Sequence, residues 1–281
     1  MKELIKAAIK KYVLESTDNW FPEINDHYYD EPIIKFASAD DPLFVEYKTI
    51  IGKDHLTPGE AFEMAFGQDS YRGGTVISIV LPISEPIKKS NRSQQDYGSR
   101  EWALLRSFGD EIFIKRFVHY VENFLSQQGH RTIGPYGAEW FKIQGSETGP
   151  ISNWSERHIA YVTGLGTFSI NDGFITEKGI AIRLISVVTE LTLTPDSRVA
   201  KQHTENCLLC SKDLCGACIA RCPVQAITKD GHDKIKCWQY VYGEESKKRG
   251  VAYGGFEKAG SGCGLCQTKV PCESENPMRF T

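Results

Sequence analysis

Nine cysteines, all in the C-terminal part of the chain, limit more than any other feature what this protein can fold into. Five of them lie in one stretch, 207–223, which reads CLLCSKDLCGACIARCP. A second group, 263–272, contains three more, and Cys237 stands alone between the groups. The first stretch ends in C-x2-C-x3-C-P, the back half of the bacterial ferredoxin run C-x2-C-x2-C-x3-C-P. This pattern predicts two [4Fe–4S] clusters.

The same spacing predicts which cysteines share a cluster. In two-cluster ferredoxins the cysteine before the proline ligates the other cluster, so the two ligand sets cross. A standard run would begin at position 212, which is Lys212, so an insertion has moved the first ligand back. The first cluster is expected to take Cys215, Cys218, Cys272 and either Cys207 or Cys210. The second cluster is expected to take Cys222, Cys237, Cys263 and Cys266, which leaves one of the nine cysteines spare.

Two other uses of the cysteines are open at this point. A structural zinc site could use the first four of them, Cys207, Cys210, Cys215 and Cys218. Zinc does not explain the Cys-Pro pair, the lone Cys237 or the second group. Disulfides are typical of small secreted domains, whereas this chain has 281 residues and its N-terminus shows no export signal. Unpaired cysteines without such a signal predict a reducing, cytoplasmic environment.

Length and charge predict two domains and exclude some partners. A chain of 281 residues with 41% hydrophobic residues can bury one large core and a smaller one, expected over 1–198 and 199–281. The net charge of −3 gives no strong attraction to a polyanion, so nucleic acid is not expected as the main partner. No apolar run approaches the length that spans a membrane.

Periodicity predicts an N-terminal domain that mixes helices and strands. Irregular structure is expected over 17–50, 88–98 and 134–151, where no period is visible. Helices are expected over 3–14, from Thr57-Pro58 onward, over 100–128 and over 155–163, with Gly129 as a cap of the third. Strands are expected over 75–81, 132–133, 174–175 and within 180–193.

Two stretches carry a family resemblance. One is 155–196, SERHIAYVTGLGTFSINDGFITEKGIAIRLISVVTELTLTPD, and the other is the cysteine region through Pro277. Together they resemble the epoxyqueuosine reductase family, which is related to the reductive dehalogenases. The resemblance implies an α+β fold, in which a nitroreductase-like α/β corrinoid-binding domain precedes a ferredoxin-like domain with two [4Fe–4S] clusters. It also implies an anaerobic reductase in which the clusters reduce the cobalt of a bound cobalamin.

The resemblance also implies site residues. The corrinoid is expected to contact the glycine-rich segment Gly164, Leu165, Gly166 and Thr167. Arg157, His158 and Lys178 are candidates to bind its amide or phosphate groups, and ordinary surface positions are the alternative for each. The family's Gly-Arg-Asp-Tyr-His segment, whose Asp is the proposed proton donor, corresponds to 99–103 here. Glu101 could keep that acid role, or it could be a solvated carboxylate in the first turn of a helix.

Two departures from the family pattern affect the expected substrate. The family's Trp-x-Gly-Lys-Asn is replaced by Thr167-Phe168-Ser169-Ile170-Asn171, and the chain continues for only nine residues after Cys272, without a helical-repeat tail. A small molecule or a corrinoid protein is therefore expected as the substrate in place of tRNA, with a reduced ferredoxin or flavodoxin-type protein as donor. An electron-transfer protein that reduces a partner's redox centre is the alternative function. A flavin in place of the corrinoid is a third possibility.

Overall fold

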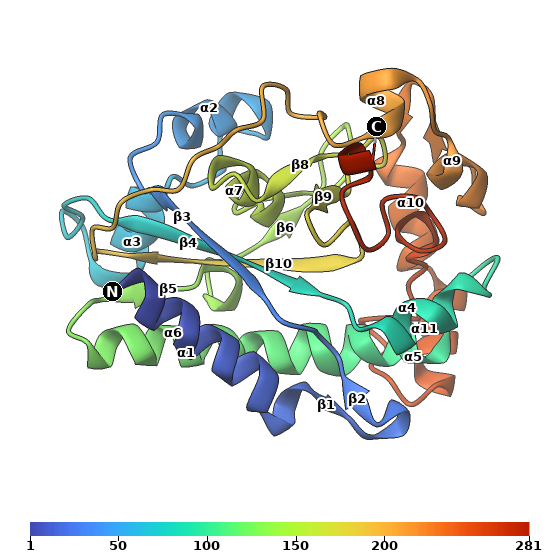
Figure 1. Ribbon diagram of the computed structural model, residues 1–281, viewed down its shortest axis with the longest axis horizontal. Helices are drawn as coiled ribbons and strands as arrows, with labels where there is room; N and C mark the ends of the chain where they lie inside the picture. Colours follow the sequence, from blue (N-terminus) through green and yellow to red (C-terminus); the bar gives the residue numbers. More distant parts are fainter. Residues whose placement is uncertain (281) are drawn as a thin grey trace.

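A four-stranded antiparallel sheet lies at the centre of the protein, a computed structural model that describes residues 1–280. The strands follow the order β3–β4–β10–β5 (Figure 1). Their bounds are β3 Ile33–Ser38, β4 Thr75–Pro82, β10 Ile182–Thr189 and β5 Thr132–Ile133. All eight residues of β4 are buried, because β3 and β10 pair with its two edges and helices cover both faces. A strand buried on both faces needs the continuous apolar run that the sequence shows there.

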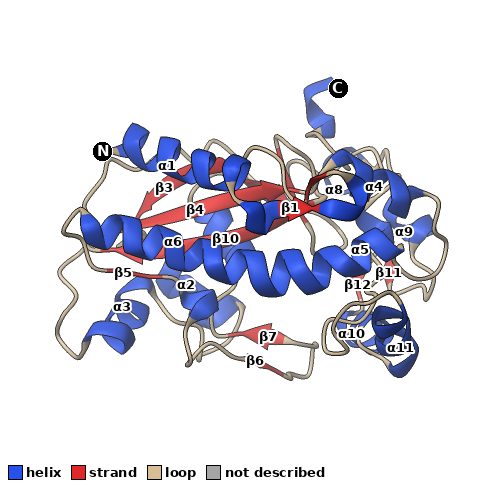
Figure 2. Ribbon diagram, turned by 90° about the horizontal axis from the view of Figure 1, so that it is seen from below, coloured by secondary structure: helices blue, strands red, loops and turns tan. Residues whose placement is uncertain are grey.

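One face of the sheet packs against a long helical run and the N-terminal helix. The run consists of α5 (Arg100–Leu104), the π-helical stretch η3 (Leu105–Phe113) and α6 (Ile114–Gln127), and Figure 2 shows it alongside α1 (Lys2–Glu15). Phe113 and Phe117 stack with their ring centroids 5.8 Å apart, and both stack on Tyr12 of α1. The aromatic side chains on one face of this helical run are thus part of the core.

The opposite face packs against α2 (Leu43–Ile50), α3 (Pro58–Phe66) and α7 (Glu156–Val162). The start of α3 is the predicted one: Thr57 is its N-cap, Pro58 its first residue, and Glu60 completes a capping box. Buried residues of all three helices, including Phe44, Phe62 and Ile159, join one apolar cluster with β4 and β10.

The cysteine-rich part of the chain gathers at one end of the sheet, where Figure 1 shows it in orange and red. Residues 190–206 lead to it across the molecule without forming a helix or strand. Asp196 anchors this connection, since its carboxylate accepts hydrogen bonds from the Phe36 amide at 2.9 Å and from Lys2 at 2.7 Å. The elements that follow are α8 Leu208–Lys212, α9 Ala217–Arg221, β11 Ile227–Thr228, β12 Gly231–His232, α10 Lys234–Val241, α11 Glu244–Ala252, η5 Leu265–Gln267 and η6 Pro277–Phe280.

The remaining elements are short and connect the larger ones. Six of the short strands form three two-stranded sheets, β1–β2, β6–β7 and β8–β9. They and the other short elements have the bounds η1 Thr17–Asn19, β1 Trp20–Phe21, η2 Pro22–Ile24, β2 Asp26–His27, α4 Glu85–Arg92, η4 Pro135–Gly137, β6 Ile143–Gln144, β7 Ile151–Ser152, β8 Gly166–Phe168 and β9 Phe174–Thr176.

Three expectations from the sequence need correction. The segment 17–50 is not irregular, because it contains β3, an edge strand of the central sheet, and α2. The segment 88–98 is not all loop, because α4 continues to Arg92. Its polar residues Lys88 and Asn91 are buried against the cysteine region. The predicted loop 134–151 includes β6 and η4. The predicted helix over 100–128 is confirmed, although its middle part is π-helical.

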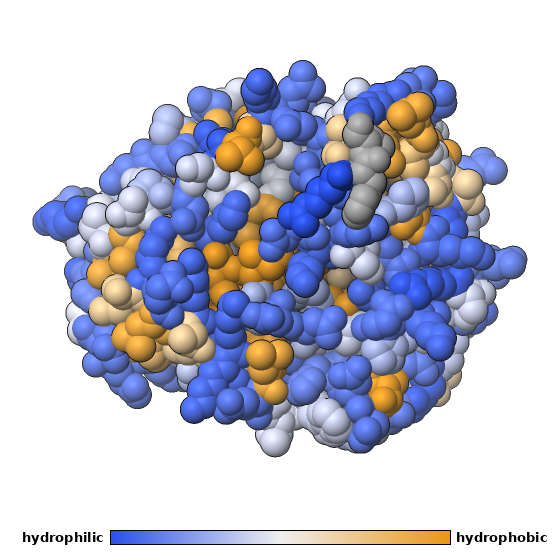
Figure 3. All heavy atoms as spheres, viewed as in Figure 1, coloured by the Kyte–Doolittle hydropathy of each residue, from blue (hydrophilic) through white to orange (hydrophobic). Residues whose placement is uncertain are grey.

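The face seen in Figure 1 is mostly hydrophilic, with an apolar area near its centre (Figure 3). Among the described residues, no helix combines the length and the apolar character needed to cross a bilayer.

Candidate functional site

The structure brings the two cysteine groups against each other. Helix α9, which carries Cys218, packs on η5, which carries Cys266. Several cysteines of both groups share an apolar cluster with Ile175, Ile180 and Ile227. All nine thiols are free, so no disulfide joins them.

Four thiols form a first set within electrostatic reach of one another. Burial raises the pKa of Cys218 to about 11, with further effects from Cys207 and Cys215. Burial also raises the pKa of Cys272, and the next causes are the charges on Cys218, Cys207 and Cys215. Because charge–charge effects fall with distance, these four side chains lie close together.

A second set forms around the other cysteine group. Burial raises the pKa of Cys263 to about 12, followed by the charges on Cys237 and Cys222. Cys266 has its pKa raised well above the usual value by burial and then by Cys263, Cys237, Cys218 and Cys222. Cys222, the cysteine before the proline, therefore lies with the second set. A crossed ligand pattern requires this arrangement, and the ligand assignment itself stays a prediction.

The two candidates for the first ligand have different environments. Cys207 is 6% exposed and accepts a hydrogen bond from the Ser169 hydroxyl at 3.6 Å, whereas Cys210 is exposed. Burial alone would raise the pKa of Cys207, but hydrogen bonds from the backbone at Cys210 and Ile170 and from Ser169 lower it. Burial raises the pKa of Cys210 to about 12, and the charge on Cys207 adds to this.

Within residues 1–280, no three His, Cys, Asp or Glu side chains converge as ligands of one metal ion would.

The hairpin β8–β9 connects both cysteine sets to the large domain. Ser169 of its turn contacts Cys207, and the amide of Asn171 donates to the Cys266 carbonyl at 3.0 Å. Next to Cys207, the Asn206 backbone N–H donates to the Thr167 hydroxyl at 2.8 Å. The connection from β9 to β10 contacts the first set as well, since the Ile180 amide donates to the Cys272 carbonyl at 2.8 Å.

The glycines that were predicted to admit a corrinoid are used by the chain itself. A Cβ on Gly164, which has φ +74°, would lie 2.7 Å from the Ser197 carbonyl oxygen, and one on Gly166 would lie 2.2 Å from that of Ile175. Between them, Leu165 is buried in an apolar cluster. The glycines therefore allow close packing of the hairpin and of the connection 190–206. A corrinoid contact at Gly164–Thr167 stays a prediction.

Arg157 lies beside the second cysteine set, and its side chain is exposed. Its guanidinium donates to the Asp172 carbonyl at 2.5 Å, and the charges on Asp172 and Cys237 act on it. Arg157, Asp172 and His232 form a polar group beside Cys237, which we call the Arg157 group.

His232 connects Asp172 to Cys237. Its Nδ1 lies 3.1 Å from a carboxylate oxygen of Asp172. Burial would lower the pKa of His232, but hydrogen bonds with Asp172 and Cys237 outweigh it and raise the pKa to about 9. His232 is thus protonated at neutral pH. The sequence indicated Asp172 only as part of an Asn-Asp-Gly turn and gave no signal for His232.

His158 and Lys178 lie in different surroundings. His158 is next to Arg157, and its Nδ1 lies 2.8 Å from the Ser155 hydroxyl. Burial, followed by the charge on Arg157, lowers its pKa to about 3, so its imidazole is neutral. Lys178 is exposed and lines a separate hollow of about 300 Å³ with residues of α1, among them Lys6 and Lys10.

Glu101 lies in the first turn of α5, directly before Trp102. It is partly exposed, and Ser99 caps the helix by accepting a hydrogen bond from the Trp102 backbone N–H at 3.1 Å. The Trp102 ring lies against Gly264, where a Cβ would be 2.2 Å from it, so α5 reaches the loop between Cys263 and Cys266. Glu101 thus directly precedes Trp102, which packs against the loop between Cys263 and Cys266. The acid role of Glu101 stays a prediction.

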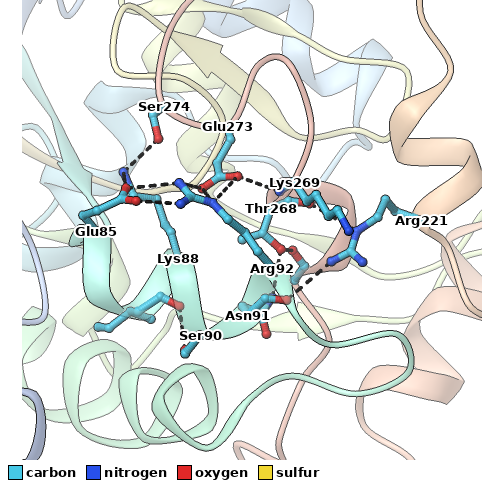
Figure 4. A network of polar contacts seen from close by, with 12 residues as sticks. Glu85, Lys88, Ser90, Asn91, Arg92, Arg221, Thr268, Lys269, Glu273 and Ser274 are labelled. Carbon is cyan, nitrogen blue, oxygen red and sulfur yellow. Dashed lines mark hydrogen bonds and ion pairs between the residues drawn. The ribbon is translucent and has the colours of Figure 1, made fainter.

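A polar network fixes α4 to the cysteine loops (Figure 4). Arg92 pairs with the buried Glu273 at 2.6 Å and with Glu85 at 2.6 Å. The Asn91 amide donates to the Cys263 carbonyl and to the Thr268 hydroxyl, each at 3.1 Å. These contacts explain why a polar segment forms a helix here.

Glu156, at the start of α7, is a buried carboxylic acid that the sequence did not indicate. One of its oxygens accepts a hydrogen bond from the Ser186 hydroxyl at 2.6 Å, and the other is buried without a partner. Burial raises the pKa of Glu156 to about 8, against smaller effects from its hydrogen bonds to Ser186 and Trp154. Trp154 also donates to the Ser186 hydroxyl, at 3.0 Å.

Comparison with solved structures identifies the fold. The epoxyqueuosine reductase of Bacillus subtilis superposes over 98% of this chain with a TM-score of 0.52 and 17% sequence identity. A second epoxyqueuosine reductase, solved with an epoxyqueuosine-modified tRNA-Tyr stem loop, superposes over 97% with a TM-score of 0.52 and 19% identity. This chain has the fold of the epoxyqueuosine reductases. It spans 66% and 64% of the lengths of those two proteins.

A reductive dehalogenase shares the fold as well. The dehalogenase in complex with 3-bromo-4-hydroxybenzoic acid superposes over 88% of this chain and 30% of its own length, with a TM-score of 0.51 and 15% identity. No protein-family model and no curated protein sequence matches the chain. The resemblance noted in the sequence is therefore confirmed by structure, as a mixed α and β fold common to both groups of reductases.

Proposed function

We propose that this protein is a corrinoid-dependent iron–sulfur reductase. Two [4Fe–4S] clusters would deliver electrons to a bound cobalamin, which would reduce a small molecule or a corrinoid protein in place of tRNA. One observation carries the proposal: two sets of free thiols, most of them at least partly buried, lie against the hairpin β8–β9, and Cys237 of the second set lies beside Arg157. The fold shared with two groups of reductases supports it.

The thiols fit the proposed clusters. The raised pKa values of Cys218, Cys263, Cys266 and Cys272 mean that these four thiols would be protonated without metal, whereas bound iron would hold them as thiolates. The first cluster would be held by Cys207, Cys215, Cys218 and Cys272. The second would be held by Cys222, Cys237, Cys263 and Cys266. Cys210 would be the spare cysteine.

The side chains of the Arg157 group suit a corrinoid with its amides and phosphate. Arg157 presents an exposed guanidinium, which binds phosphate and carbonyl oxygens well. The protonated His232 adds a second positive charge near Cys237. A bound corrinoid would supply the reducing cobalt centre. The chain itself would orient the corrinoid, exclude water and hold a proton, for which Glu101 remains the proposed donor.

A protein electron donor would approach the first cluster. Cys210 and Leu214 are exposed beside it, with Leu214 68% exposed, whereas no cysteine of the second set is classed as exposed. We therefore place the entry of electrons from a reduced ferredoxin or flavodoxin-type protein at the first cluster. A cytoplasmic location agrees with such a donor.

The test is cobalamin binding without any substrate. Protein purified anaerobically is mixed with cobalamin and passed through gel filtration, and cobalt is measured in the protein peak. The proposal predicts about one cobalt per chain, and less in Arg157→Gln than in the control Arg116→Gln, whose arginine pairs with Asp18 on the surface. Absence of cobalt from the wild-type peak contradicts the corrinoid.

An electron carrier is the second candidate, and the exposure of Cys210 at the first cluster favours it. A carrier needs an accessible cluster edge but no recess for a cofactor. Iron without cobalt in the gel-filtration experiment would establish the carrier over the enzyme. A yellow chromophore in the extract would show a flavin instead.

A further inference from the structure

Arg221 is a positive charge that lies between the two cysteine sets. It is the last residue of α9, preceded by Cys218 of the first set and followed directly by Cys222 of the second. Its side chain is only partly exposed. The proposed function assigns it no role.

Among the described residues, the hydrogen bonds of the Arg221 guanidinium go to backbone carbonyls. Figure 4 shows Arg221 beside Asn91 and Thr268. Its Nε donates to the carbonyls of Leu265 and Thr268, at 3.3 Å each, on the loop that carries Cys266. Its terminal nitrogens donate to the carbonyls of Gln94 at 2.8 Å and Asn91 at 3.4 Å. The guanidinium is therefore fixed in place by two parts of the chain.

The charge of Arg221 is not neutralised by a partner. In the described part of the chain, no salt bridge joins Arg221 to a carboxylate, whereas Arg92 pairs with two glutamates and Arg183 with Asp110. Carbonyl oxygens orient a guanidinium but carry no net charge. A full positive charge therefore acts on the surrounding groups.

This charge reaches the second cysteine set. Arg221 directly precedes Cys222, and its Nε donates to the carbonyl of Leu265, which lies between Cys263 and Cys266. A cluster bound there would feel this charge, because reduction adds one negative charge to it. A fixed cation stabilises the reduced form more than the oxidised form, and charge near the sulfurs is one of the factors that set cluster potentials.

We propose that Arg221 tunes the second cluster, raising its reduction potential so that it would take electrons from the first cluster and pass them toward the Arg157 group. This inference rests on the proposed function, because it requires the two clusters. Arg221 would act on the reduction potential of the second cluster and would touch no substrate. It is therefore a positioning residue and not a catalytic one.

The test is an EPR-monitored redox titration of the anaerobic, cluster-loaded protein. Arg221→Gln keeps hydrogen-bond donors but removes the charge, so the potential of the second cluster should become more negative while that of the first changes less. Arg221→Lys keeps the charge and should stay close to the wild type. Arg116→Gln, which removes a paired surface charge, should change neither potential.

A histidine variant supplies a readout that a merely structural role would not change. In Arg221→His the side chain loses its charge as the pH rises through about 6–7. The potential of the second cluster should then fall with pH more steeply than in the wild type. Equal potentials in Arg221→Gln and the wild type would overturn the proposal. Loss of the second cluster's iron from all three Arg221 variants would also overturn it, by showing that the arginine only holds the loop. A wild-type protein without iron would instead contradict the proposed function itself.

Discussion

The hydroxyl of Ser169 donates a hydrogen bond to the sulfur of Cys207 over 3.6 Å, which ties the hairpin β8–β9 to the first cysteine set. Three residues further along the chain, Cys210 is exposed and lacks this support. Hydrogen bonds to a sulfur stabilise its thiolate form, the form that binds metal. The two cysteines are therefore expected to behave differently.

Cys207→Ser should lose the first cluster, whereas Cys210→Ser should keep both. We expect about half of the wild-type iron in Cys207→Ser and nearly all of it in Cys210→Ser, since each cluster has its own four ligands. Iron analysis of anaerobically purified variants checks this. Iron loss from Cys210→Ser alone would reverse the assignment.

The crossed ligand sets predict which cluster each distant cysteine serves. Cys222 is only four residues from Cys218, yet Cys222→Ser should remove the second cluster, because this side chain lies with Cys263 and Cys266. Cys272→Ser should remove the first cluster. EPR spectra of the reduced variants should each show one of the two wild-type signals. The same signal remaining in both variants would exclude crossing.

Glu156 should make the protein less stable as the pH rises. Its pKa is about 8 in the folded state and about 4.3 in an unfolded chain, so the folded state binds the proton more tightly. Its contribution is therefore complete below pH ~4, declines as the pH rises toward ~8, and is constant above that. Glu156→Gln should remove this decline and be more stable than the wild type at pH ~9 by roughly 2–4 kcal/mol.

Denaturant unfolding at several pH values measures this effect. Glu177→Gln is a suitable control, because Glu177 is exposed and pairs with Arg279 on the surface. An unchanged pH dependence in Glu156→Gln would show that the carboxyl group is solvated in the folded protein.

The pair Arg92–Glu273 should contribute measurably to stability. Glu273 is 6% exposed, so Arg92→Ala would leave a buried carboxylate without its cation. We expect a loss of about 2–3 kcal/mol in the free energy of unfolding, less than for a fully buried pair because Arg92 is partly exposed. Arg116→Ala, which breaks a surface pair, should cost less than about 1 kcal/mol. Equal losses in the two variants would show that the network of Figure 4 adds little.

Local patterns in the sequence predicted the parts of the fold that depend on near neighbours. The Thr57 cap, the buried strand over 75–81 and the aromatic stripe ending in α6 all follow from short-range spacing. The strand Ile33–Ser38 was not predicted, because this short segment is stabilised as a strand by its pairing with β4, which is distant in sequence. Helix α4 was missed because buried contacts with the cysteine loops, distant in sequence, stabilise its polar residues.

The candidate site, too, could be predicted from the sequence only in part. Cysteine spacing predicted two groups of thiols, because cluster ligands follow a sequence rule. It could not predict that Gly164 and Gly166 serve the packing of the chain on itself, or that Arg157, Asp172 and His232 meet beside Cys237. These contacts depend on how residues 190–206 and the hairpin β8–β9 position the cysteine region. No local sequence pattern predicts that position.

The most direct test of the proposed reductase is the metal content of the whole protein. The chain would be produced anaerobically with cobalamin supplied, purified, and analysed for iron, cobalt and zinc. The two thiol sets and the Arg157 group predict about eight irons and about one cobalt per chain. Zinc in place of iron, or no metal at all, would contradict the two-cluster reading, and eight irons without cobalt would contradict the corrinoid.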